Sequence, residues 1–169
     1  MIRAIVKYGE HTLHRQAEPI RDITADIHAL AQDMVETMYA APGIGLAAPQ
    51  VGVPVRLFVI DLSLGHDRKG LITLINPEFV EREGMQLEEE GCLSLPGFNA
   101  TVARPDRATI KGTDLDGHER FYTGEGLLAR AFQHEFDHLE GRVFVDRLRG
   151  IKRDLIVRRI RKQIRSGQW

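Results

Sequence analysis

The sequence lacks the features that define several classes of protein. It has one cysteine, so no disulfide can form within the chain. No run approaches the ~18 apolar residues of a membrane helix, and the first residues lack the apolar stretch of a secretory signal. The net charge is −1, so no overall field draws the molecule to nucleic acid or anionic lipid. We therefore expect a cytoplasmic protein with no membrane attachment; an organellar protein whose presequence has been removed would look the same.

The composition is that of an ordinary globular protein. Hydrophobic residues make up 43% and charged residues 28% of the 169 positions, both near the usual averages. A chain of this length buries roughly two-thirds of the surface that it exposes when unfolded. The sequence contains no repeat, low-complexity segment or linker, and no pattern marks a subunit interface. We expect a single domain over 1–169 and, by default, a monomer.

The apolar pattern predicts helices at both ends of a region of strands. Apolar residues at helical spacing favour a helix over 24–40, which Pro42-Gly43 would end. The Gly- and Pro-rich segment 41–54 suggests a structured loop. A second helix is predicted over 124–139, with Gly141 at its end. Strands are expected at 55–61, 70–75, 78–83, 102–113 and 119–123, with a hairpin turn at Asp116-Gly117.

These elements favour one fold class. Strands and helices do not alternate regularly, so a doubly wound parallel sheet is not expected. The prediction is an α+β fold in which mainly antiparallel strands pack around the 124–139 helix. An N-terminal helix precedes them, and a C-terminal helical tail covers about 151–169.

The 124–139 helix carries an H-E-x-x-H motif, His134-Glu135-Phe136-Asp137-His138. Four residues make about one helical turn, so both imidazoles project from one face within reach of one ion. Glu135 is turned about 100° from His134 and can contact a water on that ion without being a ligand. The motif therefore predicts a hydrolytic metal site with Glu135 as general acid/base.

The third ligand is not given by this motif. In one class of metalloproteases a third histidine follows the motif at a fixed spacing. Here Phe144 stands at that position, and no histidine occurs after His138. Glu140 is too near along the helix to reach the ion, and Asp146 is a weak candidate. An upstream ligand is therefore favoured. The only cysteine, Cys92, lies in a polar stretch beside Gly91, where the backbone can wrap around an ion and a buried structural cysteine is less expected.

Three motifs in order give the chain a resemblance to the peptide deformylase family. They are GIGLAAPQ at 43–50, EGCLS at 90–94 and QHEFDHLEG at 133–141. The motifs are spaced about forty residues apart, and the resemblance extends over nearly the whole chain.

The resemblance implies a specific site. Cys92, His134 and His138 would bind one divalent ion, with water in the fourth position. The resemblance favours Fe²⁺ as the bound ion, with Zn²⁺ or Ni²⁺ as alternatives. Glu135 would take a proton from the metal-bound water as its oxygen attacks the formyl carbon, and the Gln50 amide and Leu93 N–H would stabilise the formyl oxygen. The substrate would be N-formylmethionyl peptides of newly made proteins, and formate would be released.

Several residues around the expected metal site have two possible interpretations. Gly45 would let a substrate peptide approach the main chain, and Ile44 and Leu127 would line a methionine pocket or belong to the ordinary core. We expect Arg104 to pair with Glu90 or Asp137, the alternative being a solvated strand residue. Arg130 stands where many bacterial members have an aliphatic residue, so it either points to solvent or borders the pocket.

The basic tail at 151–169 also has two interpretations. It is either a solvated helix face or, as proposed for bacterial deformylases, a contact to ribosomal RNA. Two rival functions remain for the chain as a whole. One is a zinc endopeptidase that uses the two histidines and a downstream acid; the other is a non-catalytic domain stabilised by a metal.

Overall fold

The computed structural model describes residues 1–169 and has the predicted α+β class with antiparallel strands. Its helices are α1 (Ala25–Ala40), α2 (Leu127–Leu139) and α3 (Ile151–Arg165), with short 3-10 helices η1 (His11–His14), η2 (Ala48–Val51), η3 (Arg68–Gly70) and η4 (Phe144–Arg147). The strands are β1 (Gly45–Ala47), β2 (Leu57–Ile60), β3 (Ile72–Glu83), β4 (Gln86–Gly91), β5 (Asn99–Arg104), β6 (Arg107–Thr113) and β7 (Glu119–Glu125). No helix is both long and apolar enough to cross a membrane.

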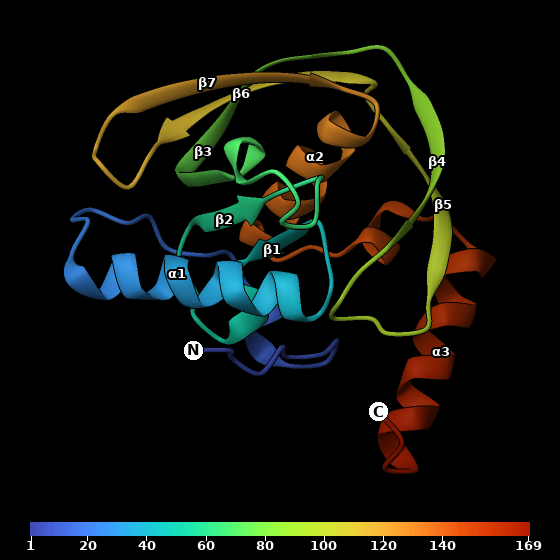
Figure 1. The fold of residues 1–169 in the computed structure, drawn as a ribbon. Coiled ribbons are helices and arrows are strands. Elements are labelled where there is room, and N and C mark those ends of the chain that lie inside the picture. The colour runs from blue at the N-terminus through green and yellow to red at the C-terminus, as the bar shows by residue number, and fades with distance from the viewer.

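A five-stranded antiparallel sheet, in the order β1-β2-β3-β6-β7, lies between α1 and α2 (Figure 1). Successive residues of a strand point to opposite faces, and β2 follows this rule with four buried residues. Leu57 and Val59 pack in the cluster that contains Met34 of α1. Phe58 and Ile60 pack in the cluster that contains Phe132 of α2. The sheet therefore holds α2, which carries the H-E-x-x-H motif, through an apolar face.

The strands β4 and β5 form a separate two-stranded sheet beside α2 (Figure 1). The predicted strand 102–113 is two strands, because the chain breaks at Pro105 and passes from one sheet to the other. β4 has no predicted counterpart, since Glu88, Glu89 and Glu90 hide its pattern. It nevertheless positions Glu90 and leads directly to Cys92.

Three other predictions of local structure are corrected. The segment 41–54 is only partly a loop, because β1 pairs with β2 and η2 follows it. A three-residue strand is too short to show a periodic pattern. The predicted strands 70–75 and 78–83 are one strand, β3, with an irregular register between Ile75 and Glu78. The second helix starts at Leu127 instead of 124, because Gly124 belongs to β7.

The C-terminal helix α3 forms the third part of the molecule. Val145 of η4 and Ile160 of α3 share a buried cluster with Val102 of β5. The indole N–H of Trp169 donates to the carbonyl of Tyr8 at 2.8 Å, which joins the two ends of the chain. The last turns of α3 project from the body of the protein (Figure 1).

Candidate metal centre

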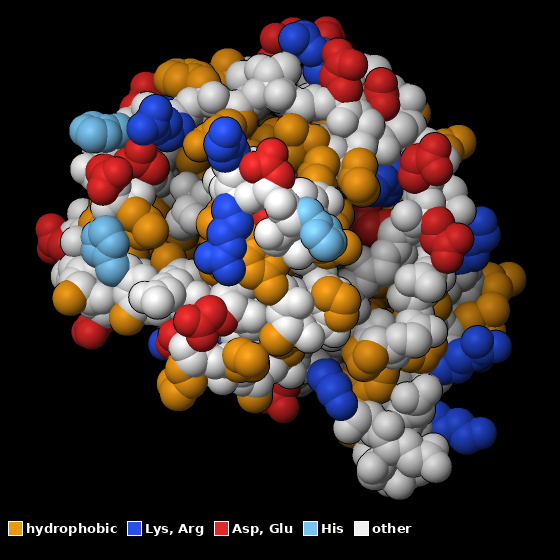
Figure 2. Space-filling model, viewed as in Figure 1, with side chains coloured by type: hydrophobic (Ala, Val, Ile, Leu, Met, Phe, Trp, Pro, Cys, Tyr) orange, Lys and Arg blue, Asp and Glu red, His pale blue; other side chains and the backbone are white.

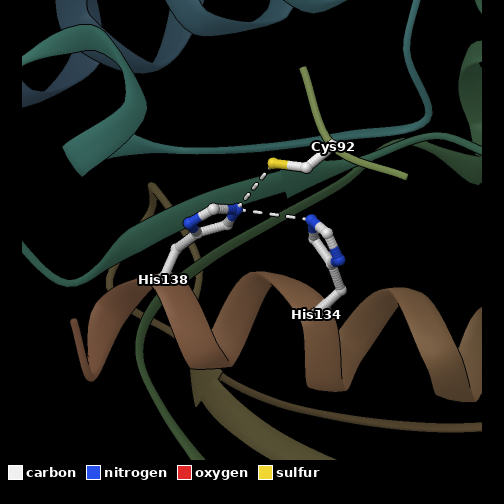
Figure 3. Close-up of side chains that lie close together, drawn as sticks. All are labelled: Cys92, His134 and His138. Carbon is white, nitrogen blue, oxygen red and sulfur yellow. Dashed lines mark hydrogen bonds between the residues drawn. The ribbon is translucent and has the colours of Figure 1, made fainter. Parts of the chain in front are cut away.

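The two histidines of the motif project from one side of α2 (Figure 3). The Nε2 atoms of His134 and His138 are 3.3 Å apart. His138 is fully buried, and burial, followed by the charge of His134, lowers its pKa well below the usual value. A neutral imidazole is the form that binds a metal ion.

Cys92 approaches these nitrogens from the end of β4 (Figure 3). Its Sγ lies 3.4 Å from Nε2 of His138. The backbone N–H of Ser94 also points at the sulfur, at 3.4 Å. Gly91 permits this turn, because a Cβ there would stand 2.3 Å from Oδ1 of Asn99. The thiol is thus held against the helix by the local backbone.

The three side chains have the geometry of a divalent ion site. One ligand atom from each residue lies within 4.8 Å of the other two. Ligands at about 2.0–2.3 Å from one tetrahedral ion stand about 3.3–3.6 Å apart, which matches the spacings described above. A thiolate and two imidazoles suit several borderline ions, among them Fe²⁺, Zn²⁺ and Ni²⁺. The residues present therefore fit a metal with an open fourth position.

Glu135 is buried beside this cluster. Its Oε1 lies 3.7 Å from Nε2 of His134, and its Oε2 has no hydrogen-bond partner. Burial raises the pKa of Glu135 to about 7. Gly45 has no side chain at this point, and a Cβ there would come 3.0 Å from the Glu135 carboxyl carbon. A side chain at position 45 would therefore crowd the Glu135 carboxyl group.

Two hydrogen-bond donors lie next to the cysteine. The amide nitrogen of Gln50 lies 3.6 Å from Sγ of Cys92 and donates to Oγ of Ser94 at 3.1 Å. The other end of the Gln50 amide accepts from the N–H of Ala47 at 3.0 Å, which fixes its orientation. The backbone N–H of Leu93 donates to no group of the chain. Both donors are available to an oxygen atom placed beside the sulfur.

A buried ionic network supports His134. Oε2 of Glu90 contacts Nδ1 of His134 at 2.6 Å. Arg104 binds Glu90 through Nε at 2.8 Å and Asp137 through Nη1 at 3.0 Å, and its side chain is 3% exposed. Burial alone would raise the pKa of Glu90, but hydrogen bonds from Arg104 and His134 outweigh it and hold the pKa well below its usual range. Arg104 is therefore not a solvated strand residue; it lies between both expected carboxylates.

A cavity of about 370 Å³ opens beside the cluster. It is lined on one side by Gly43, Ile44 and Gly45, and on the other by residues of β4 and α2. Leu127 lies at its rim and is 53% exposed, so it is not a core residue. Arg130 borders the cavity and is 4% exposed, which excludes the solvent-facing alternative.

The downstream acids do not join the cluster. Glu140 accepts from Gln16 and Arg56, and Asp146 accepts from the backbone N–H of Val143. A second acidic group, Asp114, Asp116 and His118, sits in the β6–β7 turn, where Asp114 accepts backbone N–H groups. An exposed turn of this kind has an ordinary structural explanation.

Sequence reasoning missed several partners in the site. Arg147 binds both oxygens of Asp137, at 2.6 and 3.0 Å, and no local pattern predicts it. Ser94 accepts from Gln50, and its place in the EGCLS motif was the only available signal. Gln133 is buried and donates to the carbonyls of Pro105 and Ala129. Its position next to His134 could have suggested a role in anchoring the helix.

Comparison with known proteins gives consistent matches. A family model described as polypeptide deformylase matches residues 2–154. The peptide deformylase of Acidobacterium capsulatum is 52% identical over 169 residues, covering 100% of this chain and 99% of that one. That of Thermodesulfovibrio yellowstonii is 50% identical over 154 residues, 91% of this chain and 93% of the relative. A crystal structure of a peptide deformylase from Legionella pneumophila superimposes with a TM-score of 0.91 at 43% identity, covering 99% and 98% of the two chains.

Proposed function

The chain belongs to the polypeptide deformylase family, and we propose that Cys92, His134 and His138 form the metal site of its reaction. The family consists of metal-dependent amide hydrolases, and the chain removes the N-terminal formyl group from newly made polypeptides. The observation that carries the assignment of the site is the convergence of three ligand atoms beside the buried carboxylate of Glu135.

The ion would be held by one thiolate and two neutral imidazoles, and we propose ferrous iron, with zinc and nickel as alternatives. When bound, such an ion acidifies a water molecule and polarises a carbonyl oxygen. The support is the donor set, which combines one soft and two borderline ligands. Metal analysis of protein purified without oxygen would identify the ion.

Glu135 would move the proton in this reaction. In the metal-free protein, burial raises the pKa of Glu135 to about 7, so the carboxyl group is suited to accept and release a proton near neutral pH. The attacking water gives a proton to Glu135 as its oxygen bonds to the formyl carbon. The carbon–nitrogen bond then breaks, and Glu135 returns the proton to the leaving amino nitrogen. The products are formate and a free N-terminus, and Glu135 is regenerated.

The Gln50 amide and the Leu93 N–H would stabilise the charge that develops on the formyl oxygen. The Gln50 amide nitrogen lies 3.6 Å from Sγ of Cys92, and the amide is held by Ala47 before substrate arrives. The N–H of Leu93, the residue after Cys92, makes no bond within the chain. Removing one donor of this kind raises the barrier by about 2.7–4 kcal/mol. We expect Gln50→Ala to lower kcat by a corresponding factor of ~10²–10³ without loss of metal.

The methionine side chain would occupy the cavity between β1 and α2. Ile44 and Leu127 supply apolar surface, and Gly45 lies in β1, where a peptide can approach the main chain. Support for this role comes from the position of these residues around the opening beside Cys92. Activity on formyl-Met peptides should fall when the first residue is changed to a charged one.

A formate-release assay on formyl-Met peptides, combined with metal analysis, tests the proposal. We expect the wild-type protein to bind one ion and release formate. Cys92→Ala should lose the ion, whereas Glu135→Ala should keep it and lose turnover by about 10²–10⁴-fold. A Cys92→Ala variant with full metal content would favour an endopeptidase that uses a downstream acid. Metal binding with no formate release by the wild type would favour a non-catalytic domain.

We further propose that the enzyme is a cytoplasmic monomer whose α3 contacts ribosomal RNA. Support comes from the basic side chains at the edge of the molecule where α3 projects (Figure 2). They are Lys152, Arg153, Arg158, Arg159, Arg161, Lys162 and Arg165. Truncation at Gly150 should abolish salt-dependent binding to ribosomes, and unchanged binding would refute the contact. Sedimentation of the free protein would report its oligomeric state.

A further inference from the structure

Arg130 of α2 is a buried arginine that the proposed reaction does not use. All three nitrogens of its guanidinium are hydrogen-bonded: Nε donates to Oε1 of Gln86 at 3.1 Å, Nη1 to Oε1 of Glu90 at 2.8 Å, and Nη2 to the carbonyl of Val102 at 2.8 Å. Burying a charge is costly unless it is paired and hydrogen-bonded. These contacts satisfy that need, and they join α2 to both β4 and β5.

Arg104 and Arg130 both bind the carboxylate of Glu90, one from β5 and the other from α2. Arg104 belongs to β5, the strand paired with β4, so its bonds to Glu90 lie within the two-stranded sheet. Arg130 belongs to α2, so its bonds to Glu90 and Val102 run directly from the helix to that sheet. Arg104 also reaches α2, through Asp137, which follows His134 by three residues. Arg130 binds the strand that carries Glu90 from the other side of His134, one turn earlier in the helix.

The Arg130 contact lies next to the ligand contact along both elements. His134 follows Arg130 by four residues, about one helical turn, so the two side chains share a face of α2. Cys92 follows Glu90 by two residues at the end of β4. The Arg130–Glu90 bond at 2.8 Å and the Cys92–His138 contact at 3.4 Å therefore bridge the same two elements. A shift of one bridge must displace the other.

We propose that Arg130 is a positioning residue that sets the distance between the thiolate of Cys92 and the imidazoles of α2. This inference rests on the proposed assignment of Cys92, His134 and His138 as ligands. Arg130 also balances part of the buried charge, since Glu90 faces Arg104 and Arg130, while Asp137 faces Arg104 and Arg147. Without Arg130, Glu90 keeps its bonds to Arg104 and His134 but loses its second bond to α2, one turn before His134.

The test compares Arg130→Met with Arg56→Met, using Co²⁺ as the probe ion. Methionine keeps an apolar stem along the cavity wall and removes the three donors. Arg56 is a matched control, because it also anchors α2, through Leu139 and Glu140, but on a side that does not line the cavity. We measure Co²⁺ affinity by chelator competition and the visible spectrum of the bound ion.

We expect Arg130→Met to lower Co²⁺ affinity by about 10–100-fold and to shift the visible bands, whereas Arg56→Met keeps both properties of the wild type. Arg130→Lys, which restores one charged donor, should recover part of the affinity, and it decides the question if Arg130→Met does not fold. Wild-type affinity and spectrum in the Arg130 variants would overturn the inference while Cys92→Ala still loses the ion. Failure of the wild type to bind Co²⁺ would instead refute the proposed metal site.

Discussion

The contact of α1 with the five-stranded sheet and the contact of α2 with the β4–β5 sheet rest on different chemistry. α1 meets the five-stranded sheet through apolar side chains, with Met34 and Met38 against Leu57 and Val59. α2 meets the β4–β5 sheet through buried ions, chiefly Glu90 and its arginine partners. Apolar contact is non-directional, whereas an ion pair with several hydrogen bonds has a defined geometry. The ion pairs lie beside the candidate metal ligands, whereas α1, which supplies no ligand, packs on the sheet through apolar side chains.

The first prediction breaks the polar contact. Glu90→Gln leaves Arg104 and Arg130 buried with one carboxylate fewer, and removing one partner of a buried pair costs about 3–5 kcal/mol. We expect the free energy of unfolding of the metal-free protein to fall by that amount in urea titrations. The exposed neighbour Glu88→Gln is the control and should change little. Equal stability of the two variants would show that the network contributes no more than a surface charge.

The second prediction breaks the apolar contact. Met34 is fully buried, so Met34→Ala should lower the free energy of unfolding by about 2–5 kcal/mol through lost burial and a cavity. Metal affinity and kcat of the folded protein should stay at wild-type values, since α1 supplies no ligand. The control is Met85→Ala, at a side chain that is 65% exposed. A drop in metal affinity for Met34→Ala would contradict the expectation that the α1 contact contributes stability without positioning the metal ligands.

The third prediction concerns pH. The pKa of Glu135 is raised from its ordinary 4.5 to about 7, so between these values the folded protein binds more protons than the unfolded chain. Stability contributed by this group is therefore full below pH 4.5 and falls as pH rises toward 7, by on the order of 3 kcal/mol. Metal-free Glu135→Gln should lack this decline in urea titrations at several pH values. Parallel curves for the variant and the wild type would contradict the shift.

The smallest effect is expected for an ion pair outside the buried network. Arg107 contacts Glu83 at 3.2 Å and Glu125 at 3.5 Å, but its side chain is 44% exposed. Solvent screens such pairs, so Arg107→Ala should cost less than about 1 kcal/mol in urea titrations. If Arg107→Ala lowered the free energy of unfolding as much as Glu90→Gln does, burial would not explain the difference between exposed and buried ion pairs.

The sequence predicted the local parts of this site well. The four-residue spacing of His134 and His138 fixed their common face, because helical periodicity depends only on neighbouring residues. Gly91 and the polar stretch around Cys92 marked the thiol as a candidate ligand, because both are features of its immediate neighbours in the chain. Periodicity also gave α1 and the approximate extents of β2 and β7. The strand β4 was missed because three successive glutamates hide the alternation that marks a half-buried strand.

The sequence by itself determined the fold class, and it marked the candidate metal ligands and the candidate acid/base residue next to them. Only the tertiary structure decided that Arg130 and Arg147 join the network, that Arg104 bridges two carboxylates, and that β5 and β6 lie in different sheets. The physical reason is the range of the contacts. Helix spacing and turn chemistry act between neighbours, whereas Glu90 meets Arg130 across 40 positions of the chain, so that contact exists only once the chain has folded.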